Sequence, residues 1–133
     1  MATFEDLAIW RRAKRLTVDI YKMMADCRDF GFRDQIQRAA VSIMNNIAEG
    51  SESGSNQMNI KYLLISRGSC AEVRSMLYLA QEIGYCSQNE RDRLINECQG
   101  ITGSINKLID YLRNLDDDTH DRQRKTSNVK QQT

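Results

Sequence analysis

A long heptad pattern in the second half of the chain limits the possible folds more than any other feature. A spacing of 3.5 residues held over three heptads is typical of helices that cross at the shallow angle of bundles and coiled coils. The chain has no proline and only 7% aromatic residues, which argues against a β-sandwich or barrel. We therefore expect an all-α fold. The apolar residues of the heptad pattern are Leu94, Cys98, Ile101, Ile105, Leu108, Leu112 and Leu115.

Three more blocks of helical spacing precede this one, with short breaks between them. They run from Leu7 to Cys27, from Ile36 to Gly50 and from about Asn56 to Gly84. Short links between four long helices favour an antiparallel up-down-up-down four-helix bundle.

Glycine and serine mark the expected helix ends. Gly31 can end the first helix, and Gly84 ends the third at a position where a left-handed residue is expected. Ser53 or Ser55 is expected to cap the third helix, and Ser87 opens an S-x-x-E capping box for the fourth.

The third block carries apolar residues around most of its circumference, in three separate seams. A single four-helix core can cover only part of such a helix, so we expect protein on a second side. The sequence therefore predicts a homo-oligomer, with an interface that includes Ile60, Leu64, Ile65, Met76 and Leu79.

The apolar pattern stops after Leu115. Residues 116–133 hold four acids and four bases and only Val129 as a core-forming side chain. We expect one bundle domain over residues 1–115 and a disordered polar C-terminal tail over residues 116–133.

A search for catalytic chemistry favours a non-enzymatic protein. The single histidine, His120, lies in the predicted tail, so no positioned general base is available to a serine or cysteine. The four cysteines form no CxxC pair and are expected to be reduced, buried thiols. We expect no metal, no cofactor and no small-molecule substrate. The N-terminus has neither a signal-peptide pattern nor an apolar run of membrane length, so a cytoplasmic protein with no membrane partner is expected.

Polar residues on the second and third helices allow two interpretations. Four of them follow each other at steps of four, three and four and share one helix face. They could line a ligand or RNA pocket, or they could form a structural polar network that sets helix register. We favour the network, because partly buried charges mostly find each other. Its predicted members are Arg38, Ser42, Asn45, Asn46, Glu49, Arg67 and Glu72.

Four bases in five positions on the first helix are the candidate nucleic-acid-binding residues. Such a cluster can neutralise phosphates, although a solvated helix face is the usual explanation. The net charge of +1 gives the chain no strong overall field for nucleic acid. The bases are Arg11, Arg12, Lys14 and Arg15.

Several segments together resemble the four-helix bundle family of 23S rRNA intervening-sequence proteins, also called S23 ribosomal proteins. The resemblance spans residues 4 to about 115, and its most specific part is Asn46-Ile47-Ala48-Glu49-Gly50 after Arg-Ala-x-Val-Ser-Ile. One difference is Met44, where a proline is common in the family. Supporting segments are Phe4-Glu5-Asp6-Leu7, Ile9-Trp10, Gln35-Ile36, Tyr62-Leu63, Gly68-Ser69 and Gly84-Tyr85.

The resemblance implies a small bacterial, cytoplasmic protein that forms a homopentamer of antiparallel bundles and has no established catalytic residues. A related branch binds a reverse transcriptase and nucleic acid through a markedly basic surface, which a chain of net charge +1 lacks. The sequence therefore predicts an oligomeric bundle with RNA or a ribonucleoprotein as its partner. The alternative is a protein-binding scaffold without a nucleic-acid role.

Overall fold

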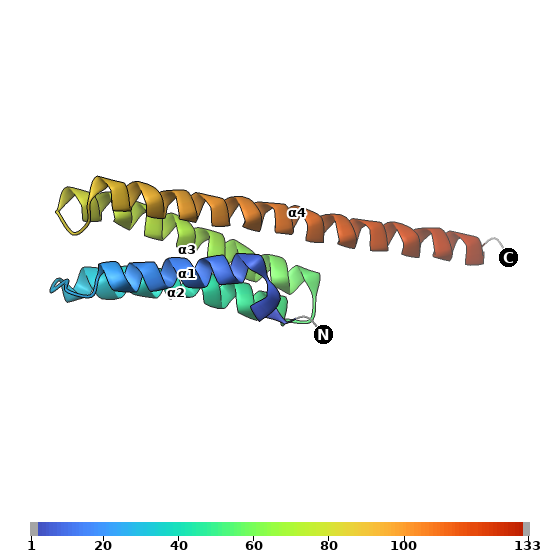
Figure 1. Cartoon of the computed structure of the whole chain (residues 1–133). Coiled ribbons are helices and arrows are strands. Elements are labelled where there is room, and N and C mark those ends of the chain that lie inside the picture. The colour runs from blue at the N-terminus through green and yellow to red at the C-terminus, as the bar shows by residue number, and fades with distance from the viewer. Residues whose placement is uncertain (1–2, 132–133) are drawn as a thin grey trace.

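The structure is a computed structural model that describes residues 3–131, and it consists of four helices after a short 3-10 helix, Phe4–Asp6. These are α1 (Ala8–Met23), α2 (Phe30–Ser51), α3 (Asn56–Glu82) and α4 (Gln88–Gln131) (Figure 1). Within the described residues there is no strand. The predicted all-α class and the number of helices are confirmed.

The helices pack as a bundle around one apolar core. α2 contacts α1 and α3, and α4 contacts α3 and α1. The α1–α2 and α3–α4 turns lie at one end and the α2–α3 loop at the other (Figure 1). The heptad residues of α4 are buried up to Leu112, except for the half-buried Leu108. The largest fully buried side chains are Leu16, Ile20, Met24, Ile36, Ile43, Ile47, Leu63, Leu77, Leu94, Ile101, Ile105 and Ile109.

The helix ends follow the capping signals with one exception. The Ser55 hydroxyl accepts the Met58 backbone N–H at 3.1 Å, and the Ser87 hydroxyl accepts that of Glu90 at 3.1 Å. Gly84 has φ +83°, the left-handed conformation expected there. Gly31 does not end α1 as predicted. It lies in the first turn of α2 because the Asp29 carboxylate caps that helix one turn earlier than expected.

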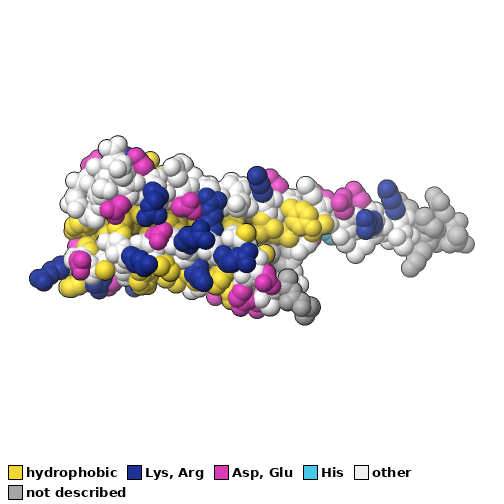
Figure 2. Space-filling model, viewed as in Figure 1, with side chains coloured by type: hydrophobic (Ala, Val, Ile, Leu, Met, Phe, Trp, Pro, Cys, Tyr) yellow, Lys and Arg dark blue, Asp and Glu magenta, His cyan; other side chains and the backbone are white. Residues whose placement is uncertain are grey.

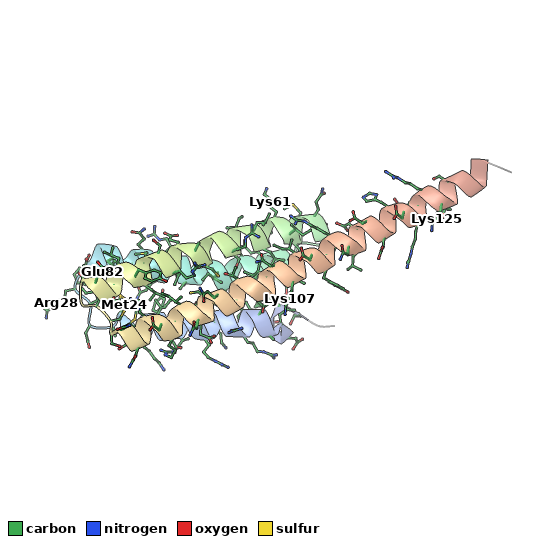
Figure 3. The ribbon with its side chains drawn as sticks, turned by 90° about the horizontal axis from the view of Figure 1, so that it is seen from above. Met24, Arg28, Lys61, Glu82, Lys107 and Lys125 are labelled. Carbon is green, nitrogen blue, oxygen red and sulfur yellow. The ribbon has the colours of Figure 1, made fainter. Side chains whose placement is uncertain are left out.

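The last part of α4 differs from the sequence prediction of a disordered tail. Residues 116–131, which we call the α4 extension, continue the helix beyond the other three (Figures 1 and 3). Neither glycine nor proline interrupts the chain after Gly103, and acid-before-base pairs such as Asp118 and Arg122 stabilise a helix without a core. The low apolar content of this segment therefore indicates that it is not buried, but it does not indicate that the segment is disordered. The division of the chain at residue 115 stays a prediction, and residues 132–133 of the predicted tail lie outside the described part.

In the part of the chain that the structure describes, no helix combines the length and apolarity needed to cross a bilayer.

Gly50 allows α2 and α3 to approach closely. A methyl group there would lie 2.9 Å from the Tyr62 Cβ and 2.7 Å from the Asn59 side-chain oxygen. We expect Gly50→Ala to lower the free energy of unfolding by about 1–3 kcal/mol, because neither helix can move away without opening the core. Urea unfolding followed by circular dichroism measures this.

The matched control is Gly103→Ala on α4, where an added methyl meets nothing within 4 Å. It should raise the free energy of unfolding by up to about 1 kcal/mol through helix propensity alone. Equal stabilisation by both substitutions would contradict the close approach at Gly50.

Candidate nucleic-acid interface

The four bases predicted on α1 do not act as one cluster. α1 buries Ala13, Leu16, Thr17 and Ile20 against the bundle, so the bases are distributed over the rest of its circumference. The Arg12 side chain reaches α4, and the Lys14 ammonium lies over the Trp10 ring, 5.3 Å from its centroid. Arg11 and Arg15 remain exposed.

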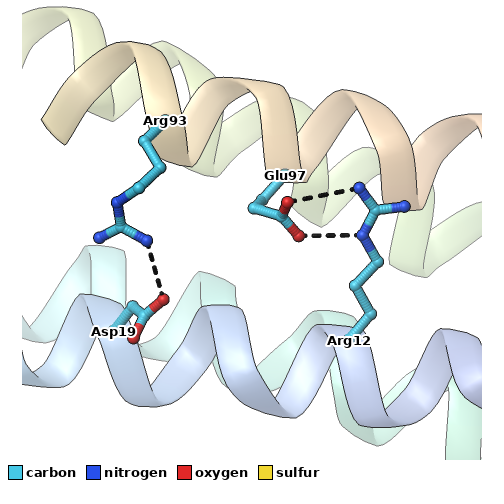
Figure 4. Close-up of polar contacts among 4 residues, drawn as sticks. All are labelled: Arg12, Asp19, Arg93 and Glu97. Atoms are coloured by element: carbon cyan, nitrogen blue, oxygen red, sulfur yellow. Dashed lines mark hydrogen bonds and ion pairs between the residues drawn. The ribbon is translucent and has the colours of Figure 1, made fainter. Parts of the chain in front are cut away.

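Arg12 forms a forked ion pair with Glu97 on α4 (Figure 4). Its Nε donates to one carboxylate oxygen at 2.9 Å and its Nη2 to the other at 3.4 Å. The hydrogen bond from Arg12 lowers the pKa of Glu97, and the same contact raises the pKa of Arg12. Gly100 makes room for this pair, because a Cβ there would overlap the guanidinium group.

A second ion pair joins the same two helices. The Arg93 Nη1 donates to the Asp19 carboxylate at 3.1 Å (Figure 4). Arg93 and Arg15, like Arg12, also lower the pKa of Glu97 through their charge, so three guanidinium groups lie near one carboxylate. We call the set Arg11, Arg12, Arg15, Asp19, Arg93 and Glu97 the α1–α4 charged face. In Figure 2, Lys and Arg side chains gather along the middle of the bundle with acidic side chains among them.

The sequence did not predict the part of this face that lies on α4, Arg93 and Glu97. Arg93 lies 74 residues after its partner Asp19, so no local pattern connects them. The available signal was that Arg93 and Glu97 are four residues apart and outside the heptad seam of α4.

The α1–α4 charged face can bind phosphate, in competition with its own carboxylates. The exposed Arg11 and Arg15 have guanidinium groups suited to phosphate oxygens. Arg12 and Arg93 already bond Glu97 and Asp19. Ion pairs this exposed contribute at most about 1 kcal/mol each, so a polyanion can displace the carboxylates at small cost.

The predicted polar network is present only in part, between α2 and α3. The Ser42 and Ser69 hydroxyls lie 2.9 Å apart, and the Asn46 amide donates to the Ser42 carbonyl at 2.8 Å. The Gln35 amide donates to the Glu72 carboxylate at 3.4 Å. The Ser42–Ser69 and Gln35–Glu72 contacts join α2 to α3, whereas the Asn46–Ser42 bond lies within α2.

The other predicted members take different positions. Arg67 donates to the Asn106 side-chain oxygen of α4 at 3.0 Å, on another side of α3. Arg38 lines an open depression of about 590 Å³ between α2 and α3. Asn45 and Glu49 are exposed, and among the described residues their side chains make no hydrogen bond.

Buried hydroxyls, which the sequence did not single out, fix α2 more firmly. The Ser66 hydroxyl donates to the Ile43 carbonyl at 2.9 Å. The Thr17 hydroxyl shares its one proton between the Ala13 carbonyl of its own helix at 2.9 Å and the Ala40 carbonyl of α2 at 3.1 Å.

The predicted oligomer interface on α3 keeps most of its members at the surface. Leu64, Ile65 and Leu79 are 36%, 46% and 50% exposed. Ile60 is partly buried against the core. Met76 must be removed from the interface, because it is 8% exposed and belongs to the bundle's own core. Because α3 has three apolar seams, its sequence does not show which of them packs into the core.

The cysteines that lie in the core are protonated thiols. Cys70 and Cys98 are fully buried, and burial raises their pKa values to about 11 and about 12. Cys27 and Cys86 are half-buried and free. Over residues 3–131, no group of three or more His, Cys, Asp or Glu side chains is arranged to hold a metal ion.

Comparison with known proteins shows the family of the chain and supports its fold. The family model of the 23S rRNA-intervening sequence protein matches residues 5–107. A solved structure, a Bacteroides thetaiotaomicron protein of unknown function from the S23 ribosomal protein family, is similar with a TM-score of 0.72 and 23% identity. The similarity covers 77% of this chain and 98% of that one and, at this identity, shows the fold alone. No curated protein matches the chain significantly.

The Arg12–Glu97 pair predicts a pH dependence. The pKa of Glu97 in the folded chain lies below its ordinary value of 4.5, so the pair stabilises the fold at neutral pH. This contribution is lost as the pH falls through the folded-state pKa. We expect Glu97→Gln to lower the free energy of unfolding at pH 7 by at most about 1 kcal/mol, because the pair is partly exposed. The difference from wild type should shrink at successive pH values below 4.5.

Denaturant unfolding across this pH range measures the effect, with Glu49→Gln as the control that removes an exposed carboxylate without a hydrogen bond. A pH-independent difference for Glu97→Gln would show that Glu97 is not the titrating group.

Proposed function

The chain belongs to the family of 23S rRNA-intervening sequence proteins, and from this premise we propose that it is a non-enzymatic binding protein that holds RNA or a ribonucleoprotein on its α1–α4 charged face. The related structure is itself of a protein of unknown function, so the proposal depends on this chain's own residues. Its further parts are an antiparallel up-down-up-down bundle and assembly as a homo-oligomer, with five copies as the family resemblance implies. Bacterial origin and a cytoplasmic location belong to the same proposal.

The observation that carries the proposal is the exposure of Arg11 and Arg15 on α1, where Arg15 lies close enough to Glu97 of α4 to act on its charge together with Arg93. Guanidinium groups on rigid helices keep their spacing, and a regular backbone of phosphates requires fixed spacing. Structured RNA therefore fits this face better than an isolated anion does, because several phosphates can be contacted at once.

The thiol chemistry supports a binding role over catalysis. A cysteine nucleophile needs its thiolate form, and burial keeps the Cys70 and Cys98 thiols protonated. His120 lies on the exposed α4 extension, where no packed element positions it against a second reacting group.

Exposed apolar side chains on α3 support self-association. Leu64, Ile65, Tyr78 and Leu79 leave apolar surface on α3 that the other three helices do not cover. Burying such surface stabilises an assembly by about 25 cal/mol per Å². Loop positions at alternate ends of the bundle support the antiparallel arrangement (Figure 1).

The alternative function is a protein-binding scaffold without nucleic acid. The net charge of +1 and the carboxylates within the charged face favour it, because both weaken attraction to a polyanion. Salt-dependent RNA binding separates the two functions.

We expect the triple substitution of Arg11, Arg15 and Arg93 by Gln to reduce binding of a labelled, structured RNA. Each phosphate contact contributes about 0.7–0.9 to the slope of log K against log salt, so the loss of Arg11 and Arg15 should lower the slope by about 1.4–1.8. Arg93 should add little, because it already bonds Asp19. Electrophoretic mobility or fluorescence anisotropy over a salt series measures this.

The control removes the same charge at exposed positions away from this face, with Arg28, Lys61 and Arg113 replaced by Gln; Figure 3 labels the first two. It should retain most of the slope. Absence of RNA binding by the wild-type chain at low salt would favour the scaffold instead.

Leu64→Glu or Ile65→Glu should shift the protein toward monomer in sedimentation velocity and leave its helicity intact, because a charge at an apolar interface loses its hydration. Val18→Glu is the matched control, since Val18 is 44% exposed but lies on α1. An unchanged mass for both α3 variants would exclude α3 from the interface.

A further inference from the structure

The α4 extension projects from the bundle without packing on it. Figure 3 shows it beyond the other helices, with Lys125 on the projecting part and Lys107 still alongside α1. Side chains from Asp117 to Ser127 are exposed. At its base, the Asn56 amide donates to the Asp116 carboxylate at 3.1 Å.

Charges on the extension are divided into two blocks. Its acids come first, at Asp116, Asp117, Asp118 and Asp121. Bases follow at Arg122, Arg124, Lys125 and Lys130, and no acid occurs after Asp121. No apolar side chain lies between residues 116 and 127. The extension therefore has an acidic half near the bundle and a basic half away from it.

The stability of a single helix explains only part of the arrangement of acids before bases along the α4 extension. Asp118 and Arg122, like Asp121 and Lys125, have the four-residue spacing that stabilises one helix. Alternating charges would provide such pairs equally well. The helix dipole favours bases near the C-terminal end of α4, but it does not favour acids in the interior of a helix that begins at Gln88.

We propose that the α4 extension is a docking arm for the same extension of a second copy, in antiparallel orientation. With the midpoint between residues 121 and 122, Asp118 of each copy lies opposite Lys125 of the other, and Asp121 opposite Arg122. The contact is isologous, so one sequence supplies both sides. A parallel pair would place acids against acids.

The chemistry of this contact sets its strength. Because the paired surfaces are charged and exposed, the association is weak for a single pair of arms and strongly screened by salt. Several arms on one oligomer would strengthen it through effective concentration. The pairing itself needs neither RNA nor the α3 interface, so its test is independent of the proposed function.

The experiment compares two full-length charge variants with the wild type by sedimentation velocity at high protein concentration. In the first, Asp116, Asp117, Asp118 and Asp121 are replaced by Lys. In the second, Arg122, Arg124 and Lys125 are replaced by Glu. At about 10 mM salt we expect a heavier wild-type species that disappears at about 1 M salt. Each variant alone should lack this species, and an equal mixture of the two should restore it.

Circular dichroism of each variant alone checks that both are folded. Equal mass for the wild type and both variants at low salt would overturn the proposal. So would a mixture that fails to restore the heavier species, or variants that change RNA binding while the protein mass stays constant.

Orientation is tested by a zero-length carbodiimide cross-link between unlabelled and ¹⁵N-labelled wild-type chains. We expect mixed-isotope products that join Asp117 or Asp118 of one copy to Lys125 of the other. Cross-links between copies that avoid these residues would overturn the antiparallel pairing.

Discussion

Close packing along α2 is the constraint on which the rest of the bundle depends. Ala39 and Ala40 are buried, and Gly50 brings α3 within contact of the α2 backbone. Buried hydroxyls from both neighbours, Thr17 and Ser66, bond to α2 carbonyls. α1 and α3 are thereby held against α2, and α4 completes the core with its heptad seam. α1 and α4 are joined by the ion pairs of Arg12 and Arg93, and Gly100 of α4 makes room for the first of them.

The same arrangement explains why the charged face is only moderately basic. Arg12 and Arg93 serve both the α1–α4 contact and the surface, and each already has a carboxylate partner. A phosphate that binds here exchanges one ion pair for another and gains little from the paired bases. Among the described residues, neither Arg11 nor Arg15 forms an ion pair with a carboxylate. They are therefore expected to supply most of the attraction to a polyanion. Binding of this kind is reversible and sensitive to salt, in keeping with a net charge of +1.

The fold was largely predictable from the sequence, because its signals are local. Heptad spacing locates α4, and the serines before α3 and α4 cap them as expected. The candidate site was predictable only on its α1 half, because the partner of Arg12 is 85 residues away. Met76 and the α4 extension differ from the predictions for a related reason. Apolarity does not show which side of an all-round apolar helix faces the core, and a lack of apolar residues does not show that a segment is unfolded.

Helix α4 runs without interruption from the core of the bundle into the exposed α4 extension, so a single helix both fills the core and carries the proposed docking surface. Its first half fills the core through Leu94, Ile101 and Ile105, and residues 117–127 carry only polar and charged side chains, which are exposed outside the bundle. Since no glycine or proline lies between Gly103 and the end of α4, the direction of the extension is set by the packing of the seam. A flexible tail with the same charges would lose far more conformational entropy on docking. Helical continuity therefore lowers the entropic cost of any contact that the extension makes, and this allows a surface without apolar residues to act as a specific docking element.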